Sequence, residues 1–203
     1  MAEVMPLAFV LASGSAGRKA MLANAGLRFA VDAAHIDEAE VKQALRAEGA
    51  PVERATEALA ELKARRVSPR HPGMLVLGAD SMLECGGAWF DKTASMAEAR
   101  RQLLCLRDRE HRLVTSAVLV KDDTRIWHST AVGRLIMRDF SEAFLDAYLE
   151  AVGEDVCASV GGYRVEGRGL QLFQRIDGDF YAIVGLPMLE LLDQLRVQGA
   201  VPS

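Results

Sequence analysis

The chain has 203 residues, of which 50% are hydrophobic and 26% are charged, and it carries a net charge of −4 with a pI near 5.6. This length suffices for a substantial core, so we expect a single domain over residues 1–203. General nucleic-acid binding is not expected, because contacts along a phosphate backbone need an excess of Lys and Arg. Since no apolar run approaches the roughly 20 residues that cross a bilayer, and the first residues lack the positive charge of a signal peptide, we expect a soluble cytoplasmic protein without a membrane partner.

The three cysteines, Cys85, Cys105 and Cys157, are odd in number and widely separated, and no two of them have CxxC spacing. This pattern favours neither a disulfide framework nor a zinc site. We expect them to be buried, small apolar residues of a reducing compartment.

The first third of the chain predicts a buried strand, two helices and a second strand between them. A continuous apolar run at residues 7–12 ends in small polar residues, as a buried strand does before a loop. The helix that follows should end at Gly26, and a second strand should come next. A long helix is expected over residues 51–66, with Leu59 and Leu62 on its inner face.

The middle of the chain is richer in predicted strands. We expect a buried strand at residues 74–80, a hairpin at 81–90 and a capping box at 95–98 in front of a helix. Two longer strands should follow at residues 111–121 and 125–137.

The last third predicts a helix at residues 141–152, a glycine-punctuated β region at 161–184 and a final helix from Pro187 to about Gly199. Because strands mix with helices throughout and some strands pair as hairpins, we expect an α/β fold with a mixed sheet flanked by helices.

The strand-to-helix turn Ser13-Gly-Ser-Ala-Gly17 precedes two cations, Arg18 and Lys19. Backbone N–H groups at a helix start, hydroxyls and cations suit an anion such as phosphate. The alternative is a tight turn followed by two solvated basic residues. The GxxxxGK[ST] spacing of a Walker loop is missing.

Acidic and basic side chains occur at several other expected junctions. Asp80 follows an apolar strand, and Asp37 and Glu38 could add oxygen ligands for a hard cation. The alternatives are a turn cap for Asp80 and the acidic first turn of a helix for the other two. Lys63 and Lys92 taken alone are explained by solvated surfaces, and the four histidines lack the close spacing of metal ligands.

Several separated segments, taken together and in order over nearly the whole chain, resemble one family. The segments are Leu11-Ala-Ser-Gly-Ser15 with Arg18, Asp37-Glu38, Leu62-Lys63-Ala64, Gly78-Ala-Asp80, Lys92, Gly161-Gly-Tyr163, Glu166-Gly167 and Val184-Gly-Leu-Pro187. They resemble the Maf family, which is also called septum-formation-inhibitor-like.

The resemblance implies a mixed α/β fold of two lobes with a central cleft, similar to inosine triphosphate pyrophosphatases, and a homodimer. It implies hydrolysis of a nucleoside triphosphate to the monophosphate and diphosphate with magnesium or manganese. The family's catalytic acid carries over onto Asp80, as proton acceptor or metal ligand, and its second, metal-binding acid onto Glu38. The residues that match its phosphate-facing positions are Ser13, Ser15, Arg18, Lys63 and Lys92, the two lysines also being expected to act in catalysis.

The base specificity implied by the resemblance is mixed. Many relatives carry Ser-Pro-Arg-Arg where this chain has Ala16 and Gly17, so one cation is missing. Glu166 matches the branch said to prefer 7-methyl-GTP, and a carboxylate suits the N–H donors of guanine. Ser81 is closer to the branch acting on thymidine and uridine triphosphates. We expect a guanine-type or modified substrate, with dTTP or UTP hydrolysis as one alternative and a non-catalytic nucleotide-binding regulator of septum formation as another.

Overall fold

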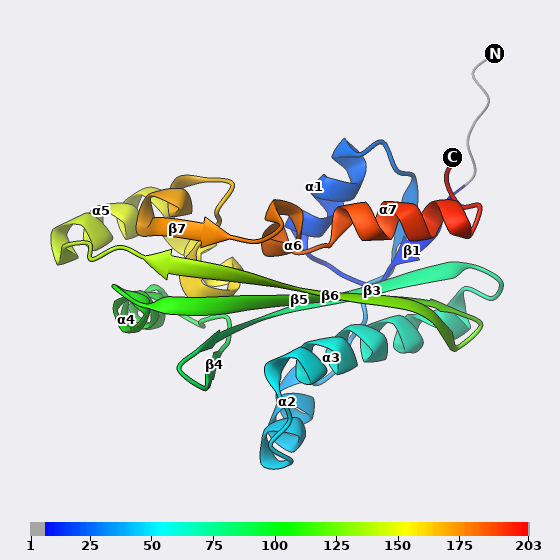
Figure 1. Cartoon of the computed structure of the whole chain (residues 1–203), viewed down its shortest axis with the longest axis horizontal. Helices are drawn as coiled ribbons and strands as arrows, with labels where there is room; N and C mark the ends of the chain where they lie inside the picture. The colour runs from blue at the N-terminus through cyan, green and yellow to red at the C-terminus, as the bar shows by residue number, and fades with distance from the viewer. Residues whose placement is uncertain (1–6, 203) are drawn as a thin grey trace. The chain divides into compact units, whose positions relative to one another are not determined.

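The computed structural model describes residues 7–202 and contains a mixed sheet with helices (Figure 1). The strands are β1 (Phe9–Leu11), β2 (Phe29–Val31), β3 (Leu75–Cys85), β4 (Ala88–Phe90), β5 (Glu110–Lys121), β6 (Thr124–Met137) and β7 (Phe173–Asp177). The α-helices are α1 (Ala16–Asn24), α2 (Glu38–Ala47), α3 (Val52–Val67), α4 (Met96–Leu106), α5 (Glu142–Val152), α6 (Phe180–Val184) and α7 (Met188–Val197). None of the helices within residues 7–202 is long and apolar enough to span a membrane.

The strands form one seven-stranded sheet in the order β2-β1-β3-β5-β6-β7, with β4 paired to β3. Strand β1 runs parallel to both β2 and β3, whereas the β3/β4 and β6/β7 pairs are antiparallel. The predicted mixed α/β sheet flanked by helices is therefore confirmed.

The chain divides into two compact units. The first contains residues up to Asp80, Thr115–Ala131 and residues from Gly185 onward. The second contains Ser81–Val114 and Val132–Val184. Strands β3, β5 and β6 each continue from one unit into the other.

Strands β1, β3 and β5 of the first unit have apolar side chains on both faces, as expected for strands covered by helices on either side. Phe9 and Leu11 of β1 pack in one cluster with residues of α1 and α7, while Val10 packs in a second cluster with residues of α3. Alternation along the strand therefore places α3 on the face opposite α1 and α7 (Figure 1).

Helix α3 lies very close to β3, and Gly78 makes this approach possible. A Cβ on Gly78 would lie 2.8 Å from the backbone nitrogen of Ala64 and would also clash with the carbonyl oxygen of Ala60. Any larger residue at position 78 would have to push the helix away from the strand.

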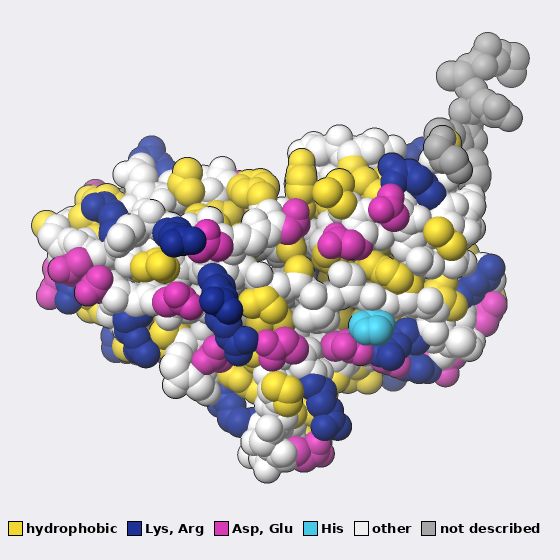
Figure 2. All heavy atoms as spheres, viewed as in Figure 1, with side chains coloured by type: hydrophobic (Ala, Val, Ile, Leu, Met, Phe, Trp, Pro, Cys, Tyr) yellow, Lys and Arg dark blue, Asp and Glu magenta, His cyan; other side chains and the backbone are white. Residues whose placement is uncertain are grey.

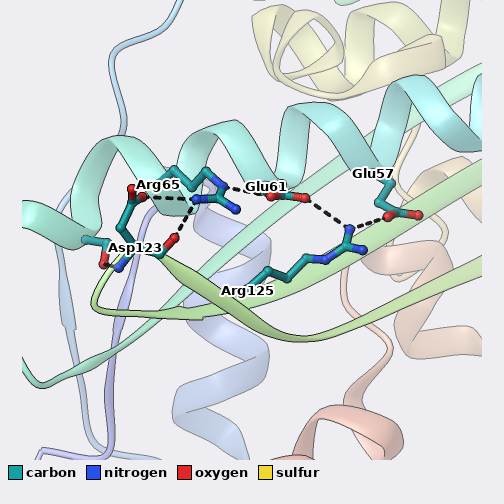
Figure 3. Close-up of polar contacts among 6 residues, drawn as sticks. Glu57, Glu61, Arg65, Asp123 and Arg125 are labelled. Atoms are coloured by element: carbon teal, nitrogen blue, oxygen red, sulfur yellow. Dashed lines mark hydrogen bonds and ion pairs between the residues drawn. The ribbon is translucent and has the colours of Figure 1, made fainter.

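An ion-pair network fixes the outer side of α3 to the turn between β5 and β6 (Figure 3). Arg125 pairs with Glu57 at 2.6 Å and with Glu61 at 3.0 Å, and Arg65 pairs with Glu61 at 2.7 Å and with Asp123 at 3.3 Å. These arginines hold the pKa of Glu61 below its usual value, chiefly through the hydrogen bond from Arg65. The network is only partly buried, so its contribution to stability should weaken with salt.

On the face shown in Figure 2, acidic and basic side chains alternate and do not gather by sign. This mixture agrees with the modest net charge of −4. On that face, no extended basic surface is visible that would follow a nucleic-acid backbone.

Most expected elements are present, and five details of the prediction were wrong. Helix α2 was not predicted as an element, although an acidic helix start was weighed at Glu38. The expected strand end at Asp80 lies in the middle of one long strand, β3. Leu62 is 37% exposed, because Lys63 takes the inward position one turn after Leu59. The expected β region at 161–184 contains a single strand, β7, preceded by short 3₁₀ turns, and Cys105 is exposed although the cysteines were expected to be buried.

A second ion-pair cluster connects Asp32, the residue after β2, to the 3₁₀ turn Ser68–Arg70 that follows α3 and to His71 after it. Arg70 binds Asp32 through two hydrogen bonds of 2.7 and 2.8 Å, and Nε2 of His71 lies 2.8 Å from the same carboxylate. The hydrogen bonds from Arg70, and next those from His71, lower the pKa of Asp32 to about 2. Asp32 therefore anchors the start of the loop that leads into α2.

Asp32→Asn should lower stability at pH 7 and have no effect in strong acid. The folded-state pKa of about 2 lies below the ordinary 3.8, so this carboxylate stabilises the fold above pH 4 and loses its effect as pH falls toward 2. Urea unfolding of both proteins across this range measures the difference. A stability gap that does not narrow between pH 4 and pH 2 would contradict the assignment.

Candidate functional site

The turn between β1 and α1 has the local structure of a capped helix start. Ser15 is the N-cap of α1, and its hydroxyl accepts a hydrogen bond of 3.4 Å from the backbone N–H of Arg18. The backbone N–H of Ser15 in turn donates to the hydroxyl of Ser13 at 3.3 Å. Helix α1 has no acidic residue in its first turn, so its positive dipole end is not offset there. Gly17 lies within that first turn, half-buried.

Arg18 is buried and connects three parts of the first unit. Its Nε donates to the carbonyl oxygen of Gly185 at 2.9 Å, and its Nη1 donates to the carbonyl oxygen of Ala79 at 3.0 Å and the hydroxyl of Ser13 at 3.2 Å. Only 8% of the residue is exposed. Burial lowers the pKa of Arg18 below its usual value, against the opposing effect of the nearby Asp80 and Glu38 carboxylates.

These contacts give Arg18 a positioning role that the sequence did not reveal. Its backbone acceptors belong to Ala79, directly before Asp80, and to Gly185, shortly before α7. Gly185 has φ of +138°, a backbone conformation that residues with a side chain rarely adopt, and this explains a glycine at this position. The expected phosphate contact of Arg18 remains a prediction.

Lys63 lies between two carboxylates that are far from it in sequence. Its Nζ is 2.6 Å from Oδ1 of Asp80, on β3, and 2.7 Å from Oε1 of Glu38, at the start of α2. Lys63 is 8% exposed and Asp80 5% exposed, whereas the side chain of Glu38 is 41% exposed. The structure therefore brings together three of the predicted site residues, and the solvated surface weighed for Lys63 is wrong.

The second oxygen of Asp80 is buried and has no hydrogen-bond partner. A buried carboxylate oxygen without a partner is costly, and a cation, a water molecule or a substrate group could satisfy it. Asp37 is different, because its carboxylate caps α2 by accepting a hydrogen bond of 3.1 Å from the N–H of Glu40. Asp37 is thus accounted for by the helix-start alternative.

The donor set suits magnesium or manganese with an incomplete protein shell. Among residues 7–202 no group of three acidic, His or Cys side chains could hold a metal ion. Magnesium, however, is commonly bound by one or two carboxylates together with waters and substrate phosphates. Glu38 and the unpaired oxygen of Asp80 meet that requirement. An open depression of about 580 Å³, lined by residues 34–38, adjoins Glu38.

The remaining predicted residues, Ser81, Lys92 and Glu166, belong to the second unit. Ser81 follows Asp80 on β3 and is half-buried, while Lys92 and Glu166 are exposed. The turn that contains Glu166 is tightly folded, because a Cβ on Gly169 would lie 2.6 Å from the carbonyl oxygen of Arg164. The roles of these three residues stay predictions.

The sequence predicts no role for the histidines, and the structure gives a structural role to two of them, His71 beside Asp32 and His111. His111 is buried, and its Nε2 lies 2.8 Å from the hydroxyl of Tyr163, at the start of the turn that contains Glu166. Burial lowers the pKa of His111 to about 4, so the imidazole is neutral at pH 7. The Gly-Gly-Tyr163 segment was noted in the sequence, but no pattern linked it to His111.

Arg18→Lys should destabilise the protein by roughly 2 kcal/mol or more, because a lysine cannot reproduce the forked contacts and leaves buried carbonyl oxygens unpaired. Urea unfolding measures the loss. Lys19→Gln, on the same helix but half-buried, is the control and should change stability little. Equal stability of Arg18→Lys and the wild type would refute the positioning role.

Comparison with known proteins shows which family the chain belongs to. A model described as Maf-like protein matches residues 8–198. The chain is 54% identical to a protein of Paramagnetospirillum magneticum named nucleoside triphosphate pyrophosphatase, over 94% of this chain and 98% of the relative. It is 48% identical to a protein of the same name from Granulibacter bethesdensis, over 95% of this chain and 98% of the relative. It is also 46% identical to a protein of Mesorhizobium japonicum named 7-methyl-GTP pyrophosphatase, over 95% and 96% of the two chains. The chain belongs to the Maf family.

Proposed function

We propose that this protein is a nucleoside triphosphate pyrophosphatase that cleaves the bond between the α and β phosphates and releases a nucleoside monophosphate and diphosphate. The observation that carries the proposal is the ammonium group of Lys63 between Glu38 and Asp80, beside a buried carboxylate oxygen without a partner. The names of the three relatives support the same reaction.

Each residue of this cluster has a part in the proposed reaction. Asp80 would accept the proton of the attacking water or bind the ion through its unpaired oxygen, and Glu38 would be the second acidic ligand. A bound magnesium or manganese ion supplies positive charge that offsets the charge developing on the phosphates. Lys63 adds a second positive charge, and the Ser13 and Ser15 turn at the start of α1 offers hydroxyl and N–H donors to phosphate oxygens. We assign Lys92 to the phosphates as well.

We further propose a guanine-type or modified base, such as 7-methyl-GTP, as the preferred substrate. The support is the exposed carboxylate of Glu166, which accepts hydrogen bonds and suits the N1–H and N2–H₂ donors of guanine. Ser81, the next residue in sequence after Asp80, favours dTTP or UTP as the second candidate. Gly17, which stands where many relatives carry an arginine, leaves the choice open. We also propose that the enzyme acts in the cytoplasm as a homodimer.

Asp80→Asn should abolish turnover, with a loss on the order of 10²-fold or more, because the variant can neither accept a proton nor offer a second anionic oxygen. Release of diphosphate from a panel of triphosphates with magnesium or manganese measures the loss. Asp37→Asn is the matched control, since Asn caps a helix as well as Asp does and should retain activity. Wild-type protein that releases no diphosphate from any triphosphate would refute the enzymatic proposal in favour of a non-catalytic regulator.

The position of cleavage can be read from the same reaction run in ¹⁸O-labelled water. Attack at the α phosphorus places the label in the nucleoside monophosphate, and this is the result expected here. Label in the diphosphate would mean attack at the β phosphorus and would contradict the proposed reaction.

Glu166→Gln should shift specificity from guanine-type substrates toward thymidine triphosphate, because the amide can donate a hydrogen bond to O4 of a pyrimidine. The ratio of kcat/KM for 7-methyl-GTP and dTTP measures this shift. Glu154→Gln, another exposed acid of the second unit, is the control. An unchanged ratio in Glu166→Gln would remove Glu166 from base recognition.

A further inference from the structure

We propose that Lys63 occupies the place of a cation between Glu38 and Asp80 in the metal-free protein, so that its ammonium group and the divalent ion compete for the same two carboxylates. Lys63 would then hold Glu38 and Asp80 close together until a metal ion and a polyphosphate bind. The inference rests on the proposed function only in taking a divalent ion as the ligand of this site.

The ammonium group of Lys63 lies in direct contact with both carboxylates. The Nζ of Lys63 lies 2.6 Å from Asp80 and 2.7 Å from Glu38, so one positive group bridges two negative ones. Lys63 and Asp80 are buried, whereas the side chain of Glu38 is 41% exposed. Without a cation between them the two carboxylates would repel each other, and the cost would fall mainly on the buried Asp80. The ammonium group therefore neutralises these two carboxylates as a bound ion would.

One oxygen of Asp80 is without a partner, so a divalent ion could approach the cluster there. Glu38, Asp80 and Lys63 together carry a charge of −1, and the nearby Lys42 and Arg18 add two positive charges. A divalent ion attracted to that oxygen would meet the ammonium group at close range, and repulsion would weaken both interactions. The phosphates of a bound nucleotide would attract the released ammonium group, so metal and triphosphate should each favour the binding of the other.

Lys42 offers a matched comparison. Its Nζ is 3.8 Å from Oε2 of Glu38, the oxygen not bound by Lys63, and it lies one helical turn further along α2. Removal of either lysine takes away one positive charge near Glu38. Lys63 contacts both Glu38 and Asp80, and this bridging contact is the feature that the comparison tests.

The test is the affinity for Mn²⁺ without nucleotide, measured from the electron paramagnetic resonance signal of the free ion. Lys63→Met should bind Mn²⁺ about tenfold more tightly than the wild type, or better still, because the competing cation is gone. Lys42→Met should gain less. Equal or weaker binding by Lys63→Met than by the wild type would overturn the proposal, as would an equal gain in the two variants.

A second measurement uses the wild-type protein, in case Lys63→Met does not fold. The ¹⁵N-ammonium resonance of Lys63, assigned by its absence in Lys63→Arg, should shift or broaden when Mg²⁺ is added without nucleotide. A resonance that stays unchanged while Mg²⁺ saturates the protein would overturn the proposal. Neither measurement uses turnover, so both would still decide this question if the protein proved not to be a pyrophosphatase.

Discussion

The close contact between α3 and β3 is the constraint on which the site depends. Gly78 has no side chain, and the backbone of α3 at Ala60 and Ala64 occupies the space that a Cβ would need. Lys63 on that helix therefore reaches Asp80, two residues further along the strand, within 2.6 Å. The outer side of the same helix is held by ion pairs to Asp123 in the β5–β6 turn and to Arg125 at the start of β6. The segment directly after the helix is held by the Asp32 cluster. The reach of Lys63 is thus set by backbone packing as well as by its own flexible side chain.

The charged cluster is better understood through function than through stability. Moving ions out of water costs several kcal/mol per ion, and the attraction between them repays this cost only in part. A buried lysine bound to a buried aspartate with one unpaired oxygen is a costly arrangement for a structural core. The same arrangement is suited to a site that binds a cation and a polyanion. The cation would contact the unpaired oxygen of Asp80, and the polyanion would contact the ammonium group of Lys63. Arg18 helps to position Asp80, because it donates a hydrogen bond to the carbonyl oxygen of the preceding residue, Ala79.

Most of the elements could be predicted from the sequence, because apolar runs, caps and turn residues act locally. The choice of Asp80 and Glu38 came from the resemblance to the family, since local patterns alone left a turn cap and a helix start as alternatives. The burial of Lys63 could not be predicted from helical spacing, since Arg65 and Arg66 beside it indicate a solvated face and Leu62 is the more apolar candidate. Only contact with the distant Glu38 and Asp80 makes a buried lysine tolerable, and periodicity carries no information on such contacts. The partners of Arg18 were missed for a similar reason, because two of them are backbone carbonyl oxygens that have no sequence signature. The sequence predicts β structure at residues 161–172, whereas Gly161 and Gly162 have positive φ angles that extended strands do not use.

The central claim is that Asp80 and Glu38 meet a divalent ion and the phosphates of a nucleotide at one place. Anomalous diffraction from crystals grown with Mn²⁺ and a triphosphate analogue whose α–β bridge cannot be hydrolysed tests this most directly. The account predicts a manganese peak within coordination distance of Asp80, with Lys63 moved onto a phosphate oxygen. A bound triphosphate and manganese ion that both lie away from Asp80, with the contacts from Lys63 to Glu38 and Asp80 intact, would contradict it.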